Sequence, residues 1–129
     1  MSMNIAITIR EQIFYGFGLI INNINRNNTN LFKQILYSMT FDKYYKIRAN
    51  AIYYLSKLIK HDTSWKNIYL NRISDLMFDN NYIVRASIIN VLKHVKMDKN
   101  DEYIVEKFTR DPHYIIRIKA KEFLNELIK

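Results

Sequence analysis

Apolar residues recur along the chain at intervals of three and four positions, which is the spacing of one face of an α-helix. In the middle of the chain they fall at Val84, Ile88, Leu92 and Val95. A half-buried β-strand would instead alternate apolar and polar residues with a period of two. The pattern therefore predicts an all-α fold.

Short polar segments separate the apolar runs, and together they predict roughly seven helices. The clearest loop is the segment NNINRNNTN at residues 22–30. The predicted helices cover about residues 9–25, 31–40, 44–60, 65–77, 82–95, 101–109 and 113–127.

Three of the predicted helices begin with one shared pattern, at residues 42–55, 79–92 and 111–124. In each, an Asp is followed by Tyr three residues later, Ile or Val five later, Arg six later and Leu thirteen later. A second amphipathic run precedes each Asp, so the unit is expected to be two antiparallel helices joined by a tight turn. The Asp is expected to serve as N-cap of the second helix. A unit that recurs in this way indicates a stacked repeat architecture.

The recurring arginines lie beside the buried stripe of the second helix, and they allow two interpretations. They could form a row of anion-binding guanidiniums. Alternatively, each could pair with an Asp of its own or a neighbouring turn, because a guanidinium binds a carboxylate in fixed bidentate geometry. We favour the second interpretation, since a residue that recurs in register usually serves the unit itself. The expected ladder consists of Asp42, Arg48, Asp79, Arg85, Asp111 and Arg117.

The Asp-x-x-Tyr-x-(Ile/Val)-Arg pattern resembles the HEAT-repeat family, whose members are armadillo-like helical proteins. The spacings of 38, 37 and 32 residues between Arg10, Arg48, Arg85 and Arg117 are consistent with units of that family's size. The resemblance implies an α-α superhelix, or solenoid, of about three and a half helical hairpins in a single domain, residues 1–129. The units are expected at about residues 31–60, 64–96 and 101–129, preceded by a partial unit at residues 5–25 in which Asn4 stands in place of the Asp.

Charge and composition limit the classes of partner and the cellular location that we expect for the protein. The chain has 129 residues, no Cys and a formal net charge of +8, with an excess of five positive charges before Trp65 and three from Trp65 on. Such an excess is typical of proteins that bind nucleic acid, anionic lipid or an acidic protein, and equally of lysines that only cover solvated faces. The most apolar stretch, residues 13–24, is too short and too interrupted to span a bilayer. We therefore expect a cytoplasmic protein without a membrane partner.

Candidate catalytic chemistry is sparse in this sequence. His61, His94 and His113 are far apart, and none has a second ligand at metal-binding spacing. The single Gly-x-Gly, at Gly16 and Gly18, lies in an apolar helix and lacks the rest of a phosphate-binding loop. We expect no catalytic residues, no metal and no cofactor. An enzyme similar to the bilin-attaching HEAT-like lyases is the less favoured alternative.

Stacked repeats align equivalent helices, so equivalent positions form a continuous face, usually the concave one. Opposite and beside the buried stripe, this face mixes aromatic, amide and basic groups. We expect it to bind a partner protein or peptide, with Tyr15 and Tyr53 as anchors and Lys57 and Lys93 as steering charges. The expected binding residues are Tyr15, Asn50, Tyr53, Lys57, Asn90, Lys93, His94, Lys119 and Glu122.

Two further expectations concern partners. The basic charge, together with a similarity to DNA-repair glycosylases built from such repeats, keeps nucleic-acid binding as the alternative function. In addition, Ile115 and Ile118 are predicted to lie on the side of the last helix that faces away from its buried stripe. This arrangement predicts that a partner or a second copy docks at the C-terminal end, or that the stack continues in a longer assembly.

Overall fold

The computed structural model describes residues 10–12, 29–60 and 62–128. Most of the predicted first helix, including Tyr15, lies outside the described residues. Residues 10–12 are helical, the rest of the described chain forms six α-helices and two 3-10 helices, and the described residues contain no β-strand. The α-helices are α2 (Thr29–Met39), α3 (Tyr45–Ile59), α4 (Lys66–Leu76), α5 (Tyr82–Leu92), α6 (Glu102–Phe108) and α7 (Tyr114–Ile128). The 3-10 helices η2 (Thr63–Trp65) and η3 (Lys99–Asp101) lead into α4 and α6.

The prediction of an all-α fold is confirmed for these residues, and most helix bounds fall within one or two residues of those expected. The exception is α5, which ends at Leu92 instead of the expected residue 95. There the backbone tightens, with N–H groups of His94 and Val95 donating to the carbonyls three residues earlier, at Val91 and Leu92. Such tightening of the last turn is a common way for a helix to end.

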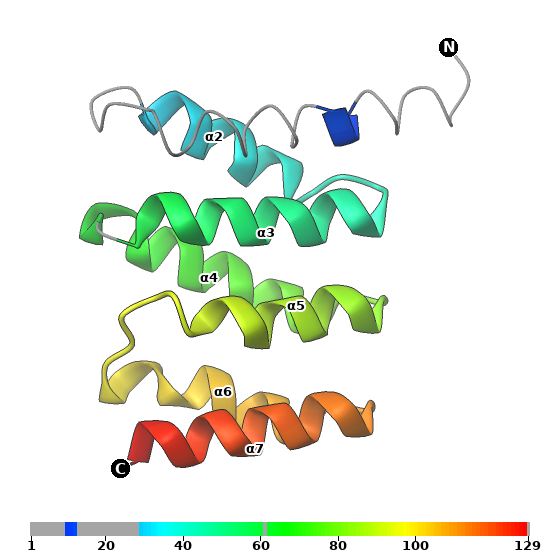
Figure 1. Cartoon of the computed structure of the whole chain (residues 1–129), viewed down its shortest axis with the longest axis vertical. Coiled ribbons are helices and arrows are strands. Elements are labelled where there is room, and N and C mark those ends of the chain that lie inside the picture. Colours follow the sequence, from blue (N-terminus) through cyan, green and yellow to red (C-terminus); the bar gives the residue numbers. More distant parts are fainter. Residues whose placement is uncertain (1–9, 13–28, 61, 129) are drawn as a thin grey trace.

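Consecutive helices pack as pairs, and the pairs lie next to one another. Figure 1 shows α3, α5 and α7 one below the other, with α2, α4 and α6 behind them. The helix contacts agree, since α2 packs on α3 and α6 on α7, while α3 packs on α5 and α5 on α7. The α2–α3, α4–α5 and α6–α7 turns lie along one edge of the molecule, at the right of Figure 1.

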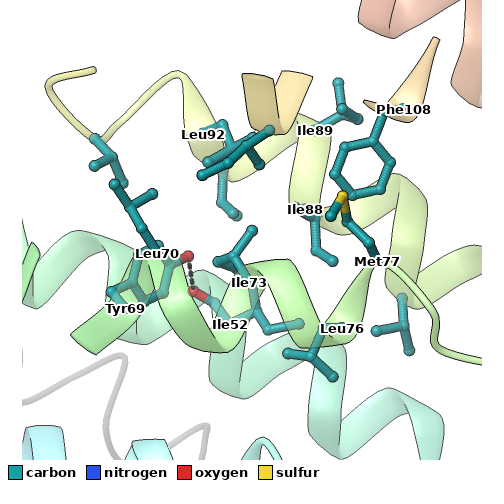
Figure 2. Packing of buried hydrophobic residues seen from close by; sticks show 14 of the residues in the cluster. Ile52, Tyr69, Leu70, Ile73, Leu76, Met77, Ile88, Ile89, Leu92 and Phe108 are labelled. Atoms are coloured by element: carbon teal, nitrogen blue, oxygen red, sulfur yellow. Dashed lines mark hydrogen bonds between the residues drawn. The ribbon is translucent and has the colours of Figure 1, made fainter. Parts of the chain in front are cut away.

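The core consists of the repeated apolar positions that the sequence pattern identifies. Five residues after each Asp, the side chains of Ile47, Val84 and Ile116 are fully buried. Figure 2 shows side chains of α4 within the same apolar cluster as those of α3 and α5. There the buried hydroxyl of Tyr69 donates to the Ile52 carbonyl, 3.0 Å away, which satisfies a polar group that would otherwise be costly to bury. Burial also raises the pKa of the Tyr69 phenol far above its usual range.

The recurring Asp does not cap its helix as expected. Asp42, Asp79 and Asp111 each accept a hydrogen bond from the backbone N–H two residues later, at 2.8–2.9 Å. The N-cap of α5 is Asn81, whose side chain accepts from Ile83 N. The Asp therefore shapes the turn before the helix, and this position leaves its carboxylate able to reach an arginine of the preceding hairpin.

Candidate protein-binding surface

Paired Asp and Arg side chains join neighbouring hairpins and determine which cations remain available for a ligand. Arg48 on α3 binds the Asp79 carboxylate in bidentate fashion, with Nε to Oδ2 at 2.8 Å and Nη2 to Oδ1 at 3.0 Å. Its Nη1 donates to the carbonyls of Asp42 and Lys43, both at 2.9 Å. One guanidinium thus connects its own turn and the next turn through hydrogen bonds and an ion pair.

The same arrangement recurs at the neighbouring hairpins. Arg85 binds Asp111, with Nε to Oδ2 at 2.9 Å, and donates to the Asp79 carbonyl at 2.6 Å. Arg10 pairs with Asp42 at 2.8 Å. Each of these three arginines therefore pairs with the carboxylate of the Asp in the following turn. Arg48 and Arg85 contact the Asp six residues earlier only through its backbone carbonyl.

Arg117 makes the contacts within its own turn but not the ion pair with a following turn. Its Nη1 donates to the carbonyls of Asp111 and Pro112, at 2.7 and 2.9 Å. In the described residues no carboxylate pairs with its guanidinium. Arg48 and Arg85, by contrast, are about as buried as their carboxylates and are already neutralised, so a row of anion-binding arginines does not form at these positions.

A second set of ion pairs, which the sequence interpretation did not anticipate, lies at the opposite ends of the hairpins. Lys33 of α2 is buried and pairs with Asp62, and Lys66 of α4 pairs with Asp101 at 2.9 Å. The hydrogen bonds from Lys33 and from Ser64 hold the pKa of the Asp62 carboxyl below its usual range. The signal was the 33-residue spacing of the two lysines, which resembles the length of the repeat.

A shallow groove of about 290 Å³ runs between α3 and α5. It brings together three of the expected binding residues, Asn50, Tyr53 and Asn90, which are exposed side chains. The Tyr53 ring is 38% exposed, and Lys57 Nζ lies 4.7 Å from its centroid. The remaining lining residues are Ala49, Ser87 and Val91. We refer to this feature as the α3–α5 groove.

Two small side chains, Ala49 and Ser87, are among the residues that line this groove. Position seven after the Asp is Ala49 in α3 and Ala86 in α5, and position eight is Asn50 or Ser87. In α7 position seven is Ile118, which is 50% exposed. The repeat register therefore contained a signal for the groove, namely the small residues Ala49 and Ser87 at positions seven and eight after the Asp.

The other expected binding residues do not line the α3–α5 groove. Lys93 and His94 are exposed at the end of α5, and Lys119 and Glu122 lie on α7. Tyr15 is outside the described residues. The expected site is thus divided, because Asn50, Tyr53 and Asn90 meet in the α3–α5 groove whereas the other described members lie outside it.

A second hollow, which the sequence interpretation missed, lies at the edge formed by the turns. It has a volume of about 430 Å³ and is bordered by Phe78, directly before Asp79, and by residues of the α6–α7 turn. Phe78 is 83% exposed. The available signal was that Phe41 and Phe78 occupy the same repeat position, immediately before the Asp.

In the described part of the chain, no three His, Asp or Glu side chains lie close enough together to hold a metal ion. No helix found there has the length and apolar content needed to cross a bilayer. Comparisons with protein-family models, with curated proteins and with solved structures found no match to this chain.

Proposed function

We propose that this chain is a non-catalytic scaffold, built as a HEAT-like α-solenoid, that binds a partner protein or extended peptide along the concave side of its stack. The observation that carries the proposal is the α3–α5 groove with its aromatic and amide lining. In the described structure, the side-chain amides of Asn50 and Asn90 have no hydrogen-bond partner within the chain. An amide carries both donors and acceptors, so it suits the N–H and C=O groups of a peptide backbone.

Tyr53 supplies the apolar part of the proposed contact. Aromatic residues that keep an exposed ring and a polar tip are common energetic centres of protein interfaces. Lys57 lies against this ring and adds a positive charge at the rim, which favours partners with acidic flanking residues.

The test is a binding measurement with matched variants. Partners captured from native cell extract by the wild-type chain are identified, and their affinities are measured by calorimetry. We expect Tyr53→Ala and Asn90→Ala each to weaken binding by about tenfold, the size expected for a truncated interface anchor. Tyr114→Ala, which truncates a 60% exposed tyrosine away from the groove, is the control and should bind as the wild type does. Equal affinities for all four proteins would place the interface elsewhere.

Nucleic-acid binding is the second candidate, and the net charge of +8 favours it. The distribution of charge weakens it, because Arg48 and Arg85 are already paired with carboxylates. Titration of a labelled 20-nucleotide single strand and its duplex, at several salt concentrations, distinguishes the candidates. Micromolar binding that falls steeply with salt would favour nucleic acid. Lack of binding near physiological salt would leave the protein-binding proposal.

A further inference from the structure

The hollow at the turn edge combines an exposed aromatic ring with an apolar wall. Phe78 follows the end of α4 and is 83% exposed, whereas Phe108 and Met77 behind it are nearly buried. Exposing a phenylalanine to this extent forgoes the gain from burying its ring. We call this feature, bordered by Met77, Phe78, Lys107, Phe108, Arg110 and Pro112, the Phe78 groove.

At the preceding hairpin, a cation of the chain lies over part of the ring at the same repeat position. The Arg72 guanidinium carbon lies 3.6 Å from the centroid of Phe41, and Arg72 Nε and Nη2 each donate to Thr40 at 3.0 Å. In α6 the register position of Arg72 is occupied by Ile104, which is fully buried. No Lys or Arg of the described chain lies over the Phe78 ring in the way that Arg72 lies over Phe41. A cation–ring contact is thus present at Phe41, which is 57% exposed, and missing at Phe78, which is 83% exposed.

Two cations border the uncovered ring. The side chains of Lys107 and Arg110 are exposed, and within the described residues the Arg110 guanidinium makes no hydrogen bond or ion pair. Lys107 Nζ lies 5.3 Å from the Tyr103 centroid.

Acidic groups near these cations do not balance their charge. Asp111 belongs to the groove wall, but its carboxylate is buried and paired with Arg85. Glu106 lines a smaller hollow next to the groove together with Lys107 and Arg110. Two cations therefore face one exposed carboxylate, and the groove keeps an excess of positive charge.

We propose that the Phe78 groove is a second docking site, separate from the α3–α5 groove, for a short acidic peptide segment that carries a large apolar side chain. The apolar side chain packs between Phe78 and Phe108, and flanking Asp or Glu carboxylates pair with Lys107 and Arg110. This partner supplies the two things that the groove lacks, a cover for the ring and negative charge for the cations.

The experiment selects ligands without assuming their sequence. A displayed library of random twelve-residue peptides is selected on the immobilised full chain, and enriched peptides are synthesised and measured by fluorescence anisotropy. We expect enrichment of peptides with a large apolar residue beside Asp or Glu. Phe78→Ser and the double variant Lys107→Glu/Arg110→Glu should each weaken their binding at least tenfold.

The matched control is Lys96→Glu/Lys99→Glu, which makes the same change in net charge at two exposed lysines before α6 and should leave affinity within about twofold of wild type. Amide chemical shifts of ¹⁵N-labelled protein give a readout independent of these variants, because a bound peptide should shift Phe78, Lys107 and Arg110. The proposal is overturned if no acidic peptide is enriched, or if enriched peptides bind Phe78→Ser as tightly as wild type. It is also overturned if the peptide shifts the amide signals of other residues. The same holds if vesicles containing phosphatidylserine, added in place of peptide, are the only ligand that shifts Phe78, Lys107 and Arg110.

Discussion

At the scale of single residues, the recurring aspartate makes two contacts that together determine its position in the turn. Asp79 accepts from Asn81 N to shape the turn and also binds Arg48 of the previous hairpin. A residue inside the helix could not make both contacts, which explains why Asp79 stands two residues ahead of the N-cap, Asn81. The identity of the ladder residues was readable from their spacing. The direction of pairing was not, because a sequence period does not specify which neighbour a side chain reaches.

Replacing Asp79 with Ala should destabilise the fold by about 3 kcal/mol, because it leaves the largely buried Arg48 guanidinium without its carboxylate and removes the turn acceptor. Urea unfolding followed by circular dichroism measures the change. Asp75→Ala is the control, since this Asp is exposed and forms no ion pair with a described residue. It should change stability by less than about 0.5 kcal/mol. A similar effect for both variants would contradict the proposed role of the pairing.

The ion pair between Lys33 and Asp62 predicts a dependence of stability on pH. The folded-state pKa of Asp62 is lowered, chiefly by the hydrogen bond from Lys33, so its contribution is present above the ordinary carboxyl pKa of about 3.9 and is lost as pH falls through the folded value. We expect Asp62→Asn to cost about 1 kcal/mol at pH 7, a figure reduced because Asp62 is 30% exposed.

The Asp62→Asn difference should shrink once the pH is below the folded pKa of Asp62. Urea unfolding of both proteins from pH 7 down to pH 2 measures this change. A difference that stayed constant over the whole range would mean that the charge of Asp62 contributes nothing.

At the scale of helices, the repeat register distinguishes two buried stripes. The first stripe, which includes the fully buried Ile88, follows the helical apolar spacing and could be predicted from that spacing alone. Ten residues after each Asp comes another position, and here Ile52 and Ile89 are buried whereas Lys121 is exposed. Figure 2 places Ile89 in the same cluster as Phe108 of the following hairpin. This second stripe was not predicted, because its burial depends on how one hairpin sits on the next.

Ile89→Ala should therefore destabilise the protein by about 3 kcal/mol, the usual cost of truncating a fully buried isoleucine. The equivalent truncation in α7, Lys121→Ala, should change stability by less than about 0.5 kcal/mol. Thermal and urea unfolding of both variants test the difference between these equivalent positions. If both variants lost a comparable amount of stability, Lys121 of the third hairpin would have to be buried as Ile89 is.

At the scale of the whole molecule, α7 forms one end of the described helix layer (Figure 1). Ile115 and Ile118 are 41% and 50% exposed on this helix, beside the incompletely paired Arg117. The α3–α5 groove and the Phe78 groove lie at other places, on a helix face and at the turn edge. Three surfaces with different chemistry are thus available to partners.

We expect the wild-type chain to associate through α7 at high concentration, because two exposed isoleucines lie close together there. Sedimentation equilibrium should show a mass above 15.6 kDa that rises with concentration. Ile115→Lys/Ile118→Lys should return the mass to that of a monomer, whereas Leu31→Lys, at a 63% exposed leucine on α2, should not. A wild-type protein that stays monomeric would exclude this contact.

The ladder of guanidiniums and carboxylates gives the layer a polarity. Asp42, Asp79 and Asp111 each receive an arginine from the preceding repeat position, and the last arginine, Arg117, has no carboxylate partner among the described residues. In a contact with twofold symmetry through Ile115 and Ile118, the like charge of two Arg117 side chains would weaken the association, which agrees with its expected appearance only at high concentration. A second copy has no repeat aspartate left to neutralise Arg117, because Asp42, Asp79 and Asp111 are already paired with arginines. A different partner that presents an unpaired carboxylate in such a turn would instead extend the row.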